Sequence, residues 1–370
     1  MNNLPFHEIS GVPVSLYIHV PFCLRKCYYC AFHSVEKRFS DVGIWLEDID
    51  AQIKLIRSSV GRIIINTAYI GGGTPTVIDE AGWYEIERIL KGNFDFTPDL
   101  EFSVEANPET LNNFHVRMWK SMGVTRVSLG VQSLNDSELI FLGRKHTASD
   151  AIVAIRKLKK HFDVSADLIF GSHGQSLRSW NHSIRTLLEE RLKHVSLYQL
   201  TIEPGTQFAQ NRPDLPDGYK FYRFAQWLLP KKGLRQYEIA SFAENGHECR
   251  HNLSYWYQKN VIALGAASSG YINGLRYTHV PIPGSYKTVK IETEKLDSES
   301  SGIEAAILAL RTSWGIDKKI FAEKYGGILL NRIIHELNKI PEVYLNISEN
   351  NISLTSRGMR VANEIWSRLL

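Results

Sequence analysis

Six short apolar segments alternate with segments of helical periodicity through the first 207 residues of the chain. The predicted strands are Val14–Val20, Ile63–Ile70, Leu100–Glu105, Val127–Val131, Val164–Phe170 and His194–Leu200. The predicted helices are Asp41–Ser59, Asp79–Leu90, Glu109–Met122, Ser137–Leu142, Thr147–Lys160 and Ser176–Arg191. This alternation predicts an α/β fold with a parallel sheet and right-handed crossovers. Six strand–helix units are fewer than the eight of a full barrel.

Three of the four cysteines follow the first predicted strand directly, as Cys23, Cys27 and Cys30. Pro21 ends that strand, because proline has no N–H to donate to a ladder. The cysteines therefore lie on a loop at the carboxyl end of a strand. Clustered thiolates select zinc, copper(I) or an iron–sulfur cluster. A zinc site completed by His33 is one interpretation, and a cubane cluster with one iron open to a further ligand fits three cysteines better.

Polar residues lie in or just after the predicted strands. They are Tyr17, Glu105, Gln132, Asp167, Tyr198 and Thr201. Because ligands of parallel α/β folds bind at the carboxyl ends of the strands, these residues predict a shared pocket beside the cysteine loop. The glycines of Gly71–Thr76 follow a predicted strand, and they favour a backbone N–H cradle for an anion or carboxylate. Arg144 is a candidate partner of a carboxylate, because the guanidinium fork matches that group.

The spacing CxxxCxxC, with the aromatic Tyr29 before the last cysteine, resembles the radical S-adenosylmethionine (SAM) superfamily. The longer string YIHVPFCxxxCYYC resembles its coproporphyrinogen dehydrogenase and heme chaperone branch, the HemN/HemW family. The resemblance implies a partial, open (β/α)6 TIM-like barrel. It also implies that Cys23, Cys27 and Cys30 bind a [4Fe–4S] cluster, whose fourth iron chelates SAM. In the superfamily an electron from the cluster cleaves SAM to a 5′-deoxyadenosyl radical.

The same resemblance implies a set of SAM contacts, by matching positions in the family motifs. They are Tyr17, Tyr29, Gly72, Gly73, Thr74, Glu105, Gln132, Arg144, Asp167 and Thr201. The family shows an arrangement with two SAM molecules, so some of these residues can serve a second one.

A second family-like string lies at Leu234–Trp256, beyond the alternating region. It resembles the family's ECRHNxxYW segment, which the heme chaperone branch associates with heme binding. The resemblance implies a tetrapyrrole-facing surface, since a histidine beside aromatics and an arginine can ligate iron, stack on a macrocycle and pair with propionates. The candidates are Arg250, His251, Asn252, Tyr255 and Trp256. The glycine-rich segment Val261–Tyr277 is expected to let the substrate approach the backbone.

The sequence predicts three regions: the barrel core 1–207, a barrel extension 208–298 that carries the HNxxYW segment, and a helical, winged-helix-like domain 299–370. The last is expected to hold helices Ile303–Thr312, Ile316–Tyr325, Ile328–Leu337 and Thr355–Leu370, with a polar hairpin before the last. A net charge of +4 is too small to indicate nucleic-acid binding. No apolar stretch is long enough to cross a bilayer, and peripheral membrane contact is compatible with the sequence.

The residue after CA in the cysteine motif separates the two branches of the family. The dehydrogenase carries a further cysteine there, whereas this chain has Phe32. Our first hypothesis is therefore a heme chaperone that binds heme and hands it to an acceptor protein, with an electron donor for the cluster. An oxygen-independent coproporphyrinogen III dehydrogenase is the second hypothesis, and a zinc-stabilised barrel without redox chemistry is the third. Few cysteines and a thiolate site predict the cytoplasm.

Overall fold

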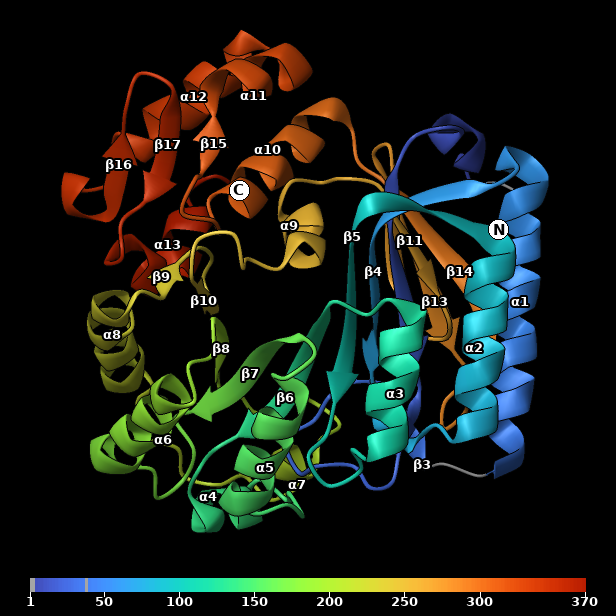
Figure 1. Ribbon diagram of the computed structural model, residues 1–370. Coiled ribbons are helices and arrows are strands. Elements are labelled where there is room, and N and C mark those ends of the chain that lie inside the picture. Colours follow the sequence, from blue (N-terminus) through green and yellow to red (C-terminus); the bar gives the residue numbers. More distant parts are fainter. Residues whose placement is uncertain (1–3, 37–38) are drawn as a thin grey trace.

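The computed structural model describes residues 4–36 and 39–370, so residues 1–3 and 37–38 of the predicted first region lie outside the described part. Its main sheet has the strand order β14-β13-β12-β11-β1-β4-β5-β6-β7-β8-β10-β9 (Figure 1). The six strands from β1 to β8 in this order pair in parallel, which confirms the predicted α/β fold. They are β1 (Val14–Val20), β4 (Ile63–Gly72), β5 (Phe94–Ala106), β6 (Arg126–Gln132), β7 (Asp163–Phe170) and β8 (His194–Gln199).

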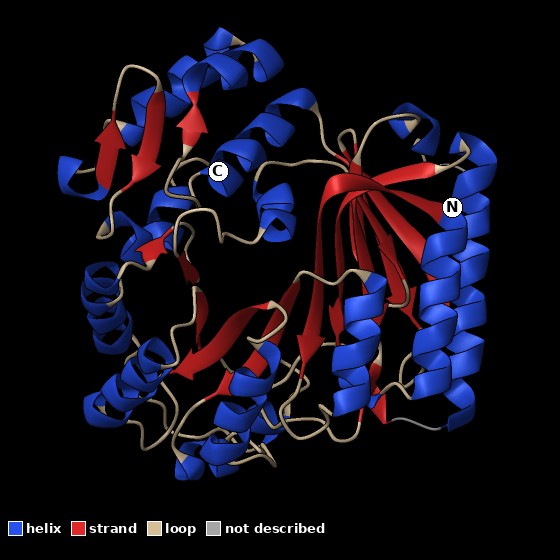
Figure 2. Cartoon of the chain, in the orientation of Figure 1, coloured by secondary structure: helices blue, strands red, loops and turns tan. Residues whose placement is uncertain are grey.

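Helices connect these strands and lie outside the curved sheet (Figure 2). They are α1 (Phe39–Val60), α2 (Glu80–Asn93), α3 (Asn113–Met122), α4 (Asp136–Phe141), α5 (Ala148–Leu158) and α6 (Leu177–Glu189). Local sequence sets their ends. The predicted N-cap Asp79 accepts a hydrogen bond from the backbone N–H of Gly82 at 3.0 Å, and Thr147 begins α5 with a capping box. Gly123 ends α3 with φ +79°, a conformation that glycine adopts without a steric cost.

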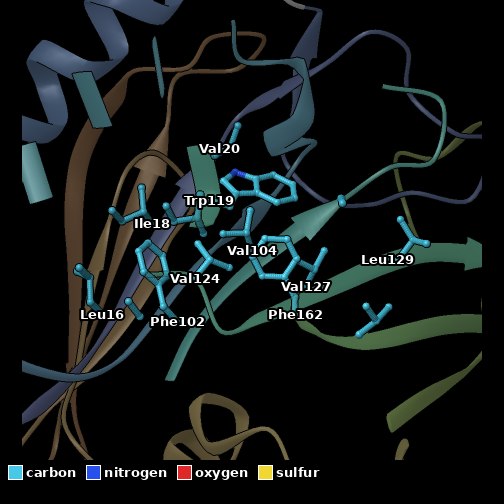
Figure 3. Close-up of a cluster of buried hydrophobic side chains, with 14 of the residues drawn as sticks. Leu16, Ile18, Val20, Phe102, Val104, Trp119, Val124, Val127, Leu129 and Phe162 are labelled. Atoms are coloured by element: carbon cyan, nitrogen blue, oxygen red, sulfur yellow. The ribbon is translucent and has the colours of Figure 1, made fainter. Parts of the chain in front are cut away.

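Successive side chains of a barrel strand point alternately into the apolar core and into the interior of the barrel. Leu16, Ile18 and Val20 of β1 belong to the main apolar cluster, which also holds Phe102 of β5 and Trp119 of α3 (Figure 3). The intervening Tyr17 and His19 are hydrogen-bonded to each other at 3.1 Å. Because successive side chains of a strand point to opposite faces, β1 carries a core face and a polar face.

Both edges of the barrel sheet are extended by strands from the region 208–298. Strand β11 (Val261–Leu264) pairs in parallel with β1, and β12 (Ser269–Ile272), β13 (Leu275–Pro281) and β14 (Thr288–Lys295) follow in antiparallel order. At the other edge, β10 (Ser241–Ala243) pairs with β8, and β9 (Arg235–Gln236) pairs with β10. The expectation that Val261–Tyr277 lets substrate approach the backbone is wrong for Val261–Leu264, because this apolar run is buried within the sheet.

Shorter elements complete this part of the chain. Strands β2 (Phe22–Cys23) and β3 (Val35–Glu36) pair in parallel at the base of the cysteine loop. The remaining elements are η1 (Phe6–Ile9), η2 (Pro75–Val77), α7 (Gln207–Gln210), α8 (Tyr219–Leu228), η3 (Pro230–Lys232) and α9 (Arg250–Trp256).

The C-terminal elements pack around an apolar cluster of their own, which includes Ala306, Ile333, Ile352 and Ile365. They are α10 (Ser298–Ala309), β15 (Ile316–Asp317), α11 (Lys318–Tyr325), α12 (Gly327–Leu337), η4 (Glu342–Tyr344), β16 (Leu345–Ile347), β17 (Asn351–Leu354), η5 (Gly358–Val361) and α13 (Ala362–Trp366). The last predicted helix, Thr355–Leu370, is shorter than expected. In the described residues, every helix is too short or too polar to cross a membrane.

Candidate functional site

The cysteine loop leaves β1 at Pro21 and returns at Val35, whose backbone N–H donates to the carbonyl of Pro21 at 2.7 Å. Within the loop, the N–H of Cys30 donates to the carbonyl of Cys27 at 3.2 Å, so a tight turn brings the last two cysteines together. All three cysteines are partly exposed and line a cavity of about 410 Å³. The loop therefore presents its thiols to the interior of the barrel.

The cavity also collects the strand-end residues that the sequence singled out. Nine of the ten predicted SAM contacts line it: Tyr29, Gly72, Gly73, Thr74, Glu105, Gln132, Arg144, Asp167 and Thr201. Tyr17 lies next to this lining, with its ring centroid 6.1 Å from that of Tyr69. The parallel register explains the convergence, because the carboxyl ends of neighbouring strands meet at one rim. Gln132 adopts φ +64° where β6 ends.

The glycine segment holds the barrel rim together and does not form the predicted anion cradle. The N–H of Gly73 donates to the carbonyl of Val20, and that of Thr74 to the carbonyl of Phe22, both at 2.7 Å. The N–H of Gly72 donates to the carboxylate of Glu105 at 3.0 Å. These donors are therefore used within the protein, so the cradle prediction is wrong. Glycine is needed because a Cβ on Gly73 would lie 2.5 Å from the carbonyl oxygen of Phe22.

Two carboxyl groups in the cavity have raised pKa values. Burial raises the pKa of Glu105 to about 7, against hydrogen bonds from Gly72 and Tyr69 that lower it. Burial likewise raises the pKa of Asp167 to about 6, although Ser128 donates to its Oδ2 at 2.8 Å. Oδ1 of Asp167 is buried and lacks a hydrogen-bond partner among the described residues. These acceptors suit a ligand that brings an ammonium group or hydroxyl groups.

Arg144 supplies the positive charge beside the thiols. Its Nη1 lies 3.6 Å from Sγ of Cys27, and its Nη2 donates to the carbonyl of Gly130 at 2.8 Å and also contacts Asn107. Burial raises the pKa of Cys30 to about 11. Burial also raises the pKa of Cys23, and the charge of Arg144 opposes that rise, which favours the thiolate form that a metal requires. Three soft thiol donors with a cation beside them fit an iron–sulfur cluster.

The geometry around His33 does not favour the zinc interpretation. Nε2 of His33 lies 2.7 Å from the carbonyl oxygen of Ser285, on another part of the chain. A tetrahedral zinc site would hold its sulfurs roughly 3.8 Å apart. Within residues 4–36 and 39–370, no three His, Cys, Asp or Glu side chains converge as ligands of a single ion. In a cubane each cysteine binds a different iron, so its sulfurs are spread more widely.

The predicted heme-facing residues lie on α9 but do not share one surface. His251 is 1% exposed, its Nδ1 lies 3.0 Å from Oγ1 of Thr67, and its ring stacks on Tyr69 with centroids 5.1 Å apart. Burial lowers the pKa of His251 to about 3, so the ring is neutral. It packs inside the barrel and is no accessible iron ligand, which corrects the prediction.

The other four candidates separate because successive residues of a helix point in different directions. Arg250 pairs with Asp99 on the surface at 2.9 Å. Asn252 lines the main cavity. Tyr255 and Trp256 line a second cavity of about 650 Å³, together with Tyr271, Tyr277 and residues of β14 and α10.

Several residues of the main cavity were missed by the sequence reasoning. Tyr69 donates to Oε1 of Glu105 at 2.9 Å, and Asn107 contacts Arg144. Cys249 lines the cavity as well, far from the cysteine loop in sequence. Tyr69 could have been found from the alternation of β4, because it precedes Gly71 by two residues and so shares its face.

Comparison with known proteins agrees with the cysteine site described above. Residues 17–187 match the model of the Radical SAM superfamily, so fold and cysteine site together define a radical SAM protein. This membership implies a [4Fe–4S] cluster and SAM as its cofactors.

Relatives of full length define the family more closely. The chain is 33% identical to the heme chaperone HemW of Bacillus subtilis, over 96% of this chain and 99% of that protein. It is 30% identical to HemW of Haemophilus influenzae, over 97% and 98%. The chain belongs to the HemW family. Its fold is also similar to coproporphyrinogen III oxidase (HemN) from Escherichia coli, with a TM-score of 0.83, 18% identity and coverage of 96% and 90%.

Proposed function

We propose that this protein is a heme chaperone of the radical SAM type, which binds heme and hands it to acceptor proteins. The observation that carries the proposal is the identity to relatives named heme chaperone HemW along almost the whole of both chains. The sequence of the cysteine loop supports it, because Phe32 stands where the dehydrogenase branch has a further cysteine. We propose the cytoplasm as its compartment, since thiolate ligands persist in a reducing environment.

The main cavity supplies the residues for the two cofactors. Cys23, Cys27 and Cys30 would hold the cluster, which supplies electrons and an open iron when bound. Glu105 and Asp167 would accept hydrogen bonds from the ammonium and ribose groups of SAM, and Arg144 would balance negative charge beside the thiolates. An electron donor, which we expect to be a protein, would reach the cluster from the side of the cysteine loop.

The second cavity is our proposed place for the macrocycle. Its volume of about 650 Å³ and its aromatic walls, Tyr255, Trp256 and Tyr271, suit a flat apolar ring. Lys259 lines the same cavity and can pair with a propionate. Arg276 there is engaged by Glu294 at 2.9 Å and by Glu304, so we assign it no contact with heme.

Heme titration followed at the Soret band tests the function. Wild type should bind about one heme per chain, and Tyr271→Ala should bind more weakly, because it removes one aromatic wall. Tyr84→Ala, which removes an exposed tyrosine of α2, is the matched control and should bind like wild type. Absence of heme binding by wild type would overturn the function. Equal binding by wild type and Tyr271→Ala would overturn only the assignment to the second cavity.

Turnover distinguishes the chaperone from the alternative enzyme. Coproporphyrinogen III, SAM and a reductant should give no protoporphyrinogen IX with the cluster-loaded protein. Formation of that product in many turnovers would assign the protein to the dehydrogenase branch instead.

A further inference from the structure

Helix α8 lies at the outer edge of the molecule (Figure 1). One of its faces carries exposed aromatic and basic side chains. Tyr219, Arg223 and Trp227 return every fourth residue, so they form one stripe along the helix. Tyr219 is 47% exposed and Trp227 is 53% exposed. Its other side packs into the protein, with Phe221, Tyr222, Ala225 and Leu228 buried. The stripe is therefore held rigidly in position.

The charge of this segment is one-sided. From Gly218 to Tyr237 the sequence contains five cations and no aspartate or glutamate. All five are exposed, and they are Lys220, Arg223, Lys231, Lys232 and Arg235. The nearest preceding acid is Asp217. We call Tyr219, Trp227 and these five cations the α8 surface.

A cation lies over one face of each of the two aromatic rings. Nζ of Lys231 lies 4.0 Å from the ring centroid of Trp227. The guanidinium carbon of Arg360, from η5, lies 5.8 Å from the ring centroid of Tyr219. A nucleic-acid base that stacked on these faces would have to displace the cations. Membrane headgroups instead contact the cations while the ring edges insert between them, so the arrangement favours a membrane over a nucleic acid.

We propose that the α8 surface docks the protein on a membrane that contains anionic phospholipids. Peripheral binding strengthens with the apolar area that enters the interface and with electrostatic attraction to anionic lipids, and this surface offers interfacial aromatic residues and a cluster of cations. Anionic headgroups attract each exposed lysine or arginine, and the attraction falls off within a Debye length. The inference is independent of the proposed heme function.

Co-sedimentation of the full chain with vesicles tests this proposal. Phosphatidylcholine vesicles that contain phosphatidylglycerol should bind the protein, and vesicles of phosphatidylcholine alone should bind it much more weakly. Binding should disappear at about 1 M salt, where the Debye length is about 3 Å. Absence of binding to the anionic vesicles at low salt would overturn the proposal.

Variants locate the contact. Lys231→Gln with Lys232→Gln should weaken binding roughly 30-fold, since each cation contributes about fivefold. Lys120→Gln with Lys160→Gln makes the same charge change at exposed lysines of α3 and the end of α5, and should have little effect. Trp227→Ala should weaken binding, and Trp227→Phe should restore part of it. An equal loss in both lysine pairs would overturn the proposal, as would binding of duplex DNA in place of vesicles.

Discussion

The carboxylate of Glu101 accepts a hydrogen bond from the backbone N–H of His251 at 2.8 Å, across 150 residues of sequence. It also accepts one from the N–H of Arg250 at 3.0 Å. These amides belong to the first turn of α9, where intrahelical acceptors are lacking. The same carboxylate lies 3.6 Å from Nε of Arg126, and both side chains are more than nine-tenths buried. A single residue of β5 therefore caps α9 and balances a buried cation.

Replacement of Glu101 by glutamine should destabilise the fold strongly. Glu101→Gln leaves the charge of Arg126 buried without its counter-ion, and such a loss costs about 3 kcal/mol in the free energy of unfolding. Urea unfolding of the metal-free protein measures it as a lower midpoint. Glu85→Gln, which removes a surface partner of Arg88, should leave the midpoint nearly unchanged. Equal midpoints for the two variants would contradict the role of Glu101.

The free energy of unfolding should depend on pH through Glu105 and Asp167. Their pKa values in the folded protein, about 7 and about 6, lie above those of unfolded carboxyls, which are about 4. The folded state thus holds protons that the unfolded state releases. Stability from these groups is therefore present at low pH and is lost as pH rises from about 4 to about 7.

Glu105→Gln separates the contribution of this residue, because glutamine resembles the protonated acid. The melting temperature of the variant should be close to that of wild type at pH 5, and it should exceed that of wild type at pH 8. Glu109→Gln, at an exposed carboxylate, should shift the melting temperature equally at both pH values. A constant difference between Glu105→Gln and wild type would show that the carboxyl of Glu105 is not held protonated by the fold.

The sequence predicted local elements better than pairings between distant ones. Strand β1 begins and ends as expected, because an apolar run stops at Pro21. Strand β5 begins at Phe94, six residues before the predicted start, since Pro98 and two aspartates obscured its pattern. The pairing of β11 with β1 joins segments more than 240 residues apart, and no local signal reports such a partner.

In the candidate site, too, features set by local sequence were predicted better than contacts between distant segments. Three thiols at one rim followed from their spacing and from the end of β1. The amides of Gly73 and Thr74 could not be assigned, because their acceptors, the carbonyls of Val20 in β1 and Phe22 in β2, become their neighbours only in the folded protein. His251 was predicted to face heme but is buried in the barrel, because the motif does not reveal which side of α9 faces the barrel.

His19 should position the cysteine loop relative to Tyr17. Its Nε2 lies 2.9 Å from the carbonyl oxygen of His33, and its Nδ1 lies 3.1 Å from the hydroxyl of Tyr17. Burial lowers the pKa of His19 to about 4, so the ring is neutral and donates from Nε2 to the carbonyl while Nδ1 accepts from Tyr17.

His19→Asn cannot span both contacts, so the loop should lose its support. We expect faster amide exchange at residues 30–36 and faster loss of iron to a chelator. The cost in the free energy of unfolding should be only about 1–3 kcal/mol, which is typical of a buried hydrogen-bond partner removed. His182→Asn, at an exposed histidine of α6, is the control. Unchanged exchange in the loop would show that other contacts hold it.

The cysteine loop should be dispensable for folding and necessary for the cluster. Cys27 is partly exposed and lies outside the apolar clusters of the described residues, so Cys27→Ser should leave the melting temperature of the metal-free protein nearly unchanged. It removes one of three thiolates, and anaerobic preparations should fall from about four irons per chain to almost none. Cys249→Ser keeps the loop intact and should retain its iron. Iron retained by Cys27→Ser, or lost by Cys249→Ser in a folded protein, would contradict the assignment, and collapse of the fold in Cys27→Ser would make the loop a structural site.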